Sequence, residues 1–341
     1  MKLHNTRLRR PFFTTSLATT SALAAALLGA CGGGDDAGST LSQEVAQGYA
    51  ADATTMTVLA ASSVDSAADA LETALGSSSG VTTDATTGAS AGNTLMQPQA
   101  LGLPGATVDC AAGGTVTWGI TGGTSVQQLN GQLDAGETYH VTYAACGVDG
   151  ALVLDGGLTL VVTAIGNGTA DLTLTASALK GTTAQGSTTL NGNKRRQRTV
   201  VDLGGGARVV TAQLSSTGVT LDSSFGTRQA SYELKSLNWT VVRTFSTTGT
   251  LTSRTHQGSL SLAASTPRRP NATLQISTSG ALTLGSDGLA SAGNFSVTTS
   301  NDRIACSYGS GTITLELDLG NNGSIDRTWI LQRVVYNAEA G

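Results

Sequence analysis

From about residue 105 onward, hydrophobic and polar residues alternate along most of the chain. A period of two places successive side chains on opposite faces of a strand, and the intervening Gly and Asn residues favour turns. The alternating runs are TVTWGIT, TYHVTYA, LTLVVTA, ADLTLTASAL, SYELKSLNWTVV, GSLSLAAS, ATLQIS, GALTLG, NFSVTT, GTITLELDL and TWILQRVV. The sequence therefore predicts an all-β domain over residues 105–341, an antiparallel meander that forms a sandwich or a barrel-like domain.

Residues 31–104 follow a different pattern and predict a flexible tether with a short amphipathic helix and a linker. The tether is CGGGDDAGST, which has no apolar content to pack. In SSVDSAADALETALG the apolar residues fall at helical spacing, and the earlier segment LSQEVAQGYAADATTMTVLA is predicted to be helical in part. The stretch over 76–104 returns to the Gly-, Ser- and Thr-rich composition of a linker.

The first thirty residues have the order of a secretory signal peptide. Four basic residues and no acidic one precede an apolar segment that ends in SALAAALLGA. Ser and Thr interrupt the apolar run, which makes it a poor candidate for an uncleaved membrane helix. The segment RRPFF over 9–13 is similar to the twin-arginine export signal, but Leu8 stands where Ser or Thr is usual, so general and twin-arginine export both stay open.

Leu28, Gly29, Ala30 and Cys31 resemble the lipobox of bacterial lipoproteins. The resemblance implies that residues 1–30 are removed and that Cys31 becomes the first mature residue, with a diacylglycerol thioether and an amide-linked acyl chain. Several buried acyl chains anchor a protein far more firmly than one. Gly32 follows the cysteine, whereas lipoproteins retained in the inner membrane of enteric bacteria often have Asp there. The resemblance therefore implies an outer-membrane lipoprotein on the periplasmic side or at the cell surface.

The net charge of the chain disfavours one class of binding partner, nucleic acid. The net charge of the whole chain is −4, and it becomes −8 once the four basic residues of the leader are removed. A negatively charged protein does not favour nucleic acid, which is bound mainly through Lys and Arg contacts to phosphates. The expected partners are the membrane, through the lipid anchor, and an envelope glycan, glycolipid or protein. The 44 glycines and the 12% of charged residues fit a β-rich extracytoplasmic protein with many tight turns.

Three cysteines remain besides Cys31. If Trp118 and Val141 lie on the two arms of a hairpin, then Cys110 and Cys146 come to face one another, and we predict a disulfide between them. Cys306 is then a free thiol in RIACSYG, expected to be a small buried strand residue. Sequence alone leaves the pairing of Cys306 with either of the other two open.

Few residues of the sequence indicate a catalytic or metal-binding site. The two histidines of the mature chain, His140 and His256, lie in alternating runs and are interpreted as strand residues. The segment DLGNNGSID is similar to a calcium loop, with Asp318, Asn322 and Asp326 as oxygen ligands. Gly320 stands where a ligand is expected and Trp329 where the bidentate Glu of an EF-hand would be, so a hairpin turn is the favoured interpretation. We predict no catalytic residues, no metal site and no cofactor.

Two small basic clusters complete the candidates. Lys194, Arg195, Arg196 and Arg198 follow an Asn-Gly pair and are predicted to lie in a solvated hairpin turn, with contact to an acidic surface as the alternative. Arg268 and Arg269 form the second cluster. The function that we expect is therefore a lipid-anchored envelope protein whose non-catalytic β domain binds or scaffolds at the membrane surface. The alternative is an envelope hydrolase that uses paired carboxylates.

Overall fold

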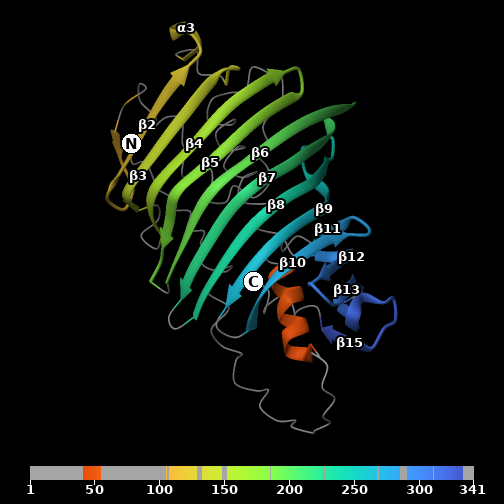
Figure 1. The fold of residues 1–341 in the computed structure, drawn as a ribbon. Helices are drawn as coiled ribbons and strands as arrows, with labels where there is room; N and C mark the ends of the chain where they lie inside the picture. Colours follow the sequence, from red (N-terminus) through yellow and green to blue (C-terminus); the bar gives the residue numbers. More distant parts are fainter. Residues whose placement is uncertain are drawn as a thin grey trace, which may run out of the picture.

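The computed structural model describes residues 41–54, 105, 107–128, 133–147, 152–184, 186–225, 228–266, 269–284, 290–309 and 311–332. Cys31, the signal peptide, the predicted helix in SSVDSAADALETALG and Arg268 lie outside these ranges. The described part of the chain is dominated by one antiparallel sheet, which confirms the predicted all-β meander (Figure 1).

Fifteen strands make up the sheet in the described ranges. They are β1 (Thr107–Asp109), β2 (Thr115–Gly122), β3 (Glu137–Gly147), β4 (Val153–Gly166), β5 (Thr169–Thr182), β6 (Gly186–Gly204), β7 (Ala207–Phe225), β8 (Arg228–Phe245), β9 (Leu251–Thr266), β10 (Arg269–Thr278), β11 (Leu282–Leu284), β12 (Ala290–Thr298), β13 (Arg303–Tyr308), β14 (Thr312–Asp318) and β15 (Arg327–Gln332). A short helix α3 (Ser125–Gln128) precedes β3, and a 3-10 turn η2 (Leu319–Asn321) follows β14.

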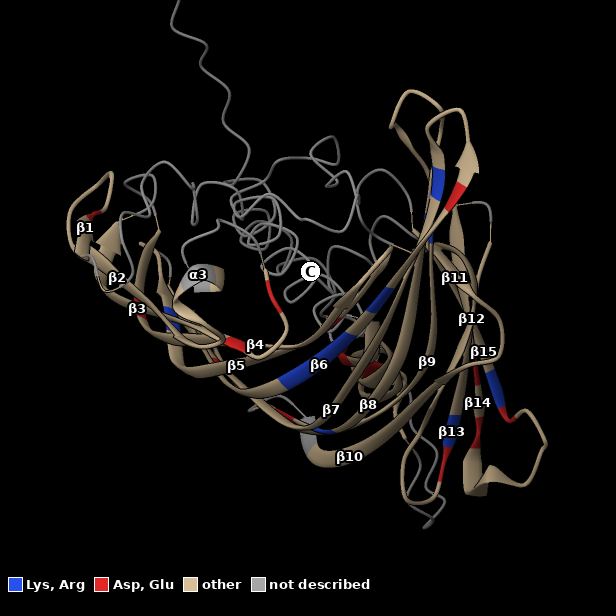
Figure 2. Cartoon of the chain, turned by 90° about the horizontal axis from the view of Figure 1, so that it is seen from above, with Lys and Arg blue, Asp and Glu red and all other residues tan. Residues whose placement is uncertain are grey.

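Each strand pairs with the strands before and after it in sequence, except that β11 lies beside β9 and β12 and off the main path. The central strands are the longest, with 19 residues in β6 and β7 and 18 in β8. At about 3.3 Å per residue these strands are roughly 60 Å long. Seen from above, the sheet curves into a trough whose two ends form opposite walls (Figure 2).

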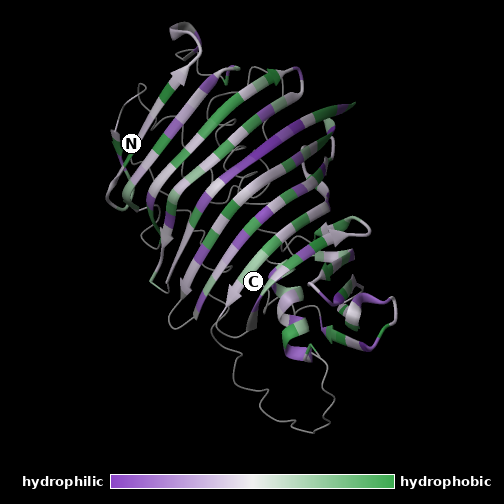
Figure 3. Cartoon of the chain, in the orientation of Figure 1, coloured by the Kyte–Doolittle hydropathy of each residue, from purple (hydrophilic) through white to green (hydrophobic). Residues whose placement is uncertain are grey.

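Two hydrophobic clusters cover the inner face of the sheet. One is built by β2–β5 around Trp118, Leu160 and Leu172. The other is built by β7–β15 around Trp239 and Leu262 and includes a helix over residues 43–54. The alternation of hydrophobic and hydrophilic positions along the strands is visible in Figure 3. It follows the period-two pattern of the sequence, because only one face of each strand is buried.

The helix over 43–54 is part of the second cluster. Its Ala46, Tyr49 and Ala50 are buried against the sheet. The Tyr232 hydroxyl on β8 donates a hydrogen bond to Asp52 Oδ1 at 3.1 Å, and the hydroxyls of Thr54 and Tyr308 lie 3.3 Å apart. The predicted partial helix in this segment is confirmed. The sequence placed it in the region that precedes the β domain, whereas in the structure it shares the core of the sheet. No helix among the described residues is long and apolar enough to cross a bilayer.

Candidate functional site

The basic cluster that follows the Asn-Gly pair lies in the middle of β6, so the prediction of a solvated turn is wrong. Asn191 and Gly192 are part of the strand instead, and Asn191 lies opposite a β-bulge of β5 at Ser177 and Ala178. The Ala178 amide on β5 donates to Asn191 Oδ1 at 2.6 Å, and Gly192 has a φ of 114°. A Cβ at Gly192 would overlap the carbonyl oxygen of Gly218 on β7. Asn191 accepts from the bulge of the neighbouring strand and Gly192 allows the close approach of β7, although an Asn-Gly pair is also typical of a turn, which explains why the sequence pattern was misleading.

Because successive side chains of a strand point to opposite faces, the basic residues of β6 lie on both the inner and the outer face of the sheet. Lys194, Arg196 and Arg198 are only 5, 1 and 6% exposed, and they face inward beside Leu172 of β5. We call these three residues, with Arg243 of β8, the inner basic strip. It forms a hydrophilic band on β6 between the two hydrophobic clusters (Figure 3).

Arg195 points to the outer face. Its guanidinium makes a two-pronged contact with Asp171 of β5, with Nε donating to Oδ1 at 2.8 Å, and Gln197 donates to Asp171 Oδ2 at 3.0 Å. The Arg195 hydrogen bonds hold the pKa of Asp171 below its usual range. The pair links two neighbouring strands on the surface, where an ion pair adds little stability.

His256 lies beside the inner basic strip. Trp239 Nε1 approaches its Nδ1 at 3.5 Å, and Arg254 Nε donates to its Nε2 at 3.1 Å. Burial, followed by the charges of Arg254 and Arg243, lowers the pKa of His256 to about 3. His256 on β9 and His140 on β3 are strand residues, as predicted, and His140 is exposed and bonded to Thr121. At neutral pH the imidazole of His256 is therefore uncharged, and its Nε2 accepts from the Arg254 guanidinium.

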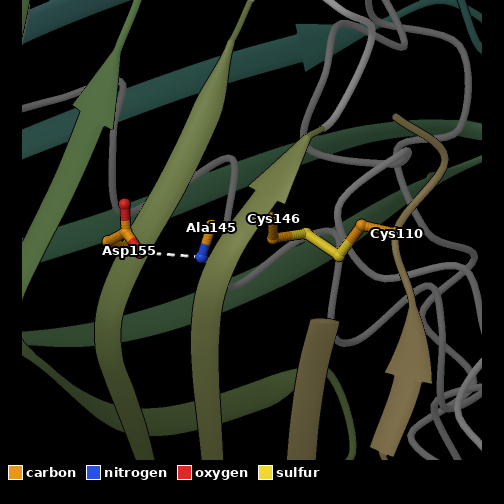
Figure 4. Close-up of a disulfide and its surroundings, with 4 residues drawn as sticks. All are labelled: Cys110, Ala145, Cys146 and Asp155. Carbon is orange, nitrogen blue, oxygen red and sulfur yellow. Dashed lines mark hydrogen bonds between the residues drawn. A yellow bond between two sulfur atoms is a disulfide. The ribbon is translucent and has the colours of Figure 1, made fainter. Parts of the chain in front are cut away.

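The cysteines lie as predicted. Cys110 and Cys146 form a disulfide with their Cα atoms 5.4 Å apart (Figure 4). Cys306 is free and buried in β13, and its burial raises the pKa of the thiol. The hairpin that led to the prediction is confirmed as well, because Trp118 pairs with Val141.

The route by which Cys110 reaches Cys146 differs from the expectation. Cys110 precedes β2 and lies at the start of the β1–β2 turn, so it is not on the arm of the hairpin. That turn is held against the end of β3, since the Ala112 amide donates to Gly147 O at 3.0 Å and the Gly147 amide to Gly113 O at 2.8 Å. The bulge at Ala145, whose amide donates to Asp155 Oδ1 at 2.7 Å, completes the approach (Figure 4).

The three candidate calcium ligands all accept hydrogen bonds from backbone amides of the β14–β15 connection. Asp318 is 1% exposed and accepts from Asn322 and Gly323, both at 2.9 Å. Asp326 Oδ2 accepts from Leu319 at 2.7 Å, and Asn322 Oδ1 accepts from Ser324 at 2.9 Å. The predicted hairpin is present, with Leu317 opposite Arg327. Within the described ranges no three His, Cys, Asp or Glu side chains lie close enough together to hold a metal ion.

We expect Asp318→Ala to lower the free energy of unfolding by about 2 kcal/mol, because it leaves two amides of the turn without their acceptor. The loss is larger than a surface turn would give, since Asp318 is buried. Urea unfolding of wild type and variant measures it, with Asp326→Ala as the exposed comparison. Chelator should leave both melting temperatures unchanged. A fall of many degrees in wild type alone would instead identify a structural calcium loop.

A polar groove lies on the outer face of the sheet. Lys180, Thr189, Asp222, Ser231 and Ser265 form a row across β5–β9, because each pairs with the next. Alternate neighbours of these residues pack against the core, which places the row on the opposite face. The groove has a volume of about 610 Å³, and Ser231 Oγ donates to Asp222 Oδ1 at 2.6 Å. Sequence reasoning missed this site because its residues meet only through strand register.

A second cavity, of about 720 Å³, lies where the helix over 43–54 begins. It is lined by Leu41, Val45 and Tyr49 on one side and by residues of β10 and of the β12–β13 turn on the other, including Asn271 and Ser300. Its walls are both apolar and polar. The cavity adjoins the polar groove, since Asn271 lines both.

No family model and no curated protein matches this sequence.

Proposed function

We propose that this chain is a lipid-anchored protein of the bacterial cell envelope, attached to the outer membrane through Cys31. The observation that carries the proposal is the LGAC motif at the end of an apolar segment with a basic start. About ten residues separate Cys31 from Leu41, where the described structure begins. A tether of this length keeps the β domain at the membrane surface, because a fully extended residue spans at most about 3.5 Å.

We further propose that the β domain is non-catalytic and binds or scaffolds at that surface. The polar groove on the outer face is lined by hydroxyl and amide side chains together with one cation and one carboxylate. Such a lining favours the binding of a polar partner, such as an envelope glycan, glycolipid or protein. The carboxylate hydrolase gains no support from the described buried carboxylates. Asp302 and Asp318 accept backbone amides of turns. Glu137 Oε2 accepts from Tyr139 and from the Asp134 amide, and Asp52 accepts from Tyr232.

Metabolic labelling with a radioactive fatty acid tests the anchor. We expect the wild-type protein to carry the label and Cys31→Ser to lose it and to accumulate with its leader uncleaved, because the cysteine thiol takes the lipid before cleavage. Gly32→Asp is the matched control. It should keep the label and move toward the inner-membrane fraction. Labelling of Cys31→Ser equal to wild type would refute lipid attachment at this residue.

A further inference from the structure

The two edges of the sheet differ in how well they are protected against pairing with another chain. β1 and β15 lie at opposite ends of the strand order, and each pairs with a single neighbour (Figure 1). β1 has only three residues and ends in the exposed Asp109, and the disulfide at Cys110 follows it directly. A very short edge strand that carries a charge is a poor template for another strand. The β1 edge is therefore poorly suited to pairing with another chain.

The β15 edge lacks these protections. The strand has six residues, RTWILQ, and its register with β14 contains no bulge. Its one charged residue, Arg327, is the first, and it contains no proline. An edge strand leaves the backbone N–H and C=O groups of alternate residues without a strand partner on its outer side. Among the described residues no strand pairs with that side of β15. This edge can therefore accept one more strand.

The side chains of β15 leave one large apolar residue in solvent. Trp329 and Leu331 pack against the hydrophobic cluster that is built by β7–β15. Ile330 lies between them, points to the outer face and is 70% exposed, more than any other exposed large hydrophobic side chain of the described residues. On β14 it lies opposite Thr314. A neighbouring strand on the other side of β15 would cover Ile330.

A second copy of β15 matches this free side. When two identical strands pair antiparallel about a two-fold axis at Ile330, this residue meets its own counterpart on the outer face. Trp329 of each copy then lies opposite Leu331 of the other copy on the inner face, and Thr328 lies opposite Gln332. Each pair joins side chains of similar polarity, and the apolar inner positions of the two strands form one continuous row. The alternation of β15 is therefore self-complementary.

We infer that β15 pairs with β15 of a second copy of this chain, so that two sheets join edge to edge in a symmetric dimer. The paired strands are about 20 Å long. An edge contact of this length is smaller than the standard interface of roughly 800 Å² per partner, so the dimer dissociates readily in solution. The pairing does not require the proposed lipid anchor. The anchor raises the local concentration of copies at the membrane surface and so increases the population of the dimer.

Introduced cysteines test the pairing and its register. The full mature chain is produced without its leader and with Cys31→Ser, and its remaining free thiol, Cys306, is buried. Directly opposite residues of antiparallel strands have Cα atoms about 4.5–5.5 Å apart, which suits a disulfide. We therefore expect Ile330→Cys to form a covalent dimer under mild oxidation. Thr328→Cys is the matched control on the same face of β15. Its two copies would lie roughly 13 Å apart along the strands and should not cross-link.

A mixture of two variants tests the same register from the other direction. Thr328→Cys and Gln332→Cys proteins should cross-link to each other when mixed, whereas Gln332→Cys alone should stay monomeric, because only the mixed pair is directly opposite. An Ile330→Cys protein that stays monomeric under oxidation would overturn the inference. So would Thr328→Cys dimers that form as readily as those of Ile330→Cys.

Sedimentation equilibrium of the same unlipidated chain, without the introduced cysteines, measures the dimer directly and independently of the anchor. We expect a monomer–dimer equilibrium whose Kd rises about tenfold in Ile330→Lys, because two like charges then meet at the centre of the paired strands. Ile325→Lys is the control, since Ile325 is 48% exposed but precedes β15, and its Kd should equal that of the unsubstituted chain. Circular dichroism verifies that both variants are folded. A chain that stays monomeric up to about 1 mM, or an equal Kd in Ile330→Lys, would refute the dimer.

Discussion

The double variant Cys110→Ser/Cys146→Ser is expected to lower the free energy of unfolding by about 4 kcal/mol. The disulfide closes a loop with a sequence separation of 36 residues, and a cross-link of that span restricts the unfolded chain by about this amount. It also fastens the β1–β2 turn to the end of β3. Because β1 has only three residues and pairs with β2 alone, this edge of the sheet has few other attachments.

Guanidinium unfolding with and without reductant measures the effect. Reductant should destabilise the wild-type protein to the level of the double variant and should leave the double variant itself unchanged. This second arm controls for any action of reductant elsewhere, since Cys306 is a free thiol in both proteins. A wild-type protein that is indifferent to reductant would show that the bridge contributes no stability.

Acid is expected to destabilise the protein through His256 well before most carboxylates titrate. The folded-state pKa of His256 is about 3, below its ordinary value of 6.5. Between these two pKa values the imidazole of His256 is protonated in the unfolded state and uncharged in the folded state. Above pH 6.5 the protonation of His256 does not change the free energy of unfolding. As the pH falls from 6.5 toward 3, the free energy of unfolding decreases by about 1.4 kcal/mol per pH unit. Between pH 7 and pH 5 the loss is about 2 kcal/mol.

His256→Gln removes this dependence while it keeps a side-chain acceptor for Arg254. The variant should be less stable than wild type at pH 7, and the difference between them should shrink by about 2 kcal/mol at pH 5. The matched control is His140→Gln, on the exposed surface of β3, which should keep the wild-type slope. Parallel pH curves for wild type and His256→Gln would contradict the buried, uncharged imidazole.

The sequence was sufficient to predict most of the strands, because period-two alternation depends on a single variable, the burial of one face. It missed β1 and the two longest strands, β6 and β7, which none of the alternating runs covers. The hairpin that pairs Trp118 with Val141 follows from that alternation and from one turn. The pairing of Cys110 with Cys146 was also predicted correctly, although the contact depends on a turn and a bulge that alternation does not encode.

The basic residues of β6 show where such reasoning fails. Asn-Gly is typical of a turn, but here Gly192 has its positive φ inside a strand and Asn191 accepts from the bulge at Ala178 on β5. Gly192 differs from a turn glycine only in what lies beside it, the carbonyl of Gly218 on the next strand. Only the register of β5, β6 and β7 shows that Arg196 is buried. The row from Lys180 to Ser265 was missed for the same reason, because five separate strands supply it.

The contacts of the helix over 43–54 determine the order in which the chain can fold as it emerges from its N-terminus during synthesis. A meander allows each strand to pair with the one that emerged just before it, so the sheet grows from one edge. The helix emerges first, yet Asp52 meets Tyr232 and Thr54 meets Tyr308, which lie 180 and 254 residues later in sequence. The helix over 43–54 therefore completes these two contacts only after β13 has been added. A chain that stops before β13 would lack the partner of Thr54, and its incompletely packed helix would be open to the proteases and chaperones that recognise unfolded segments.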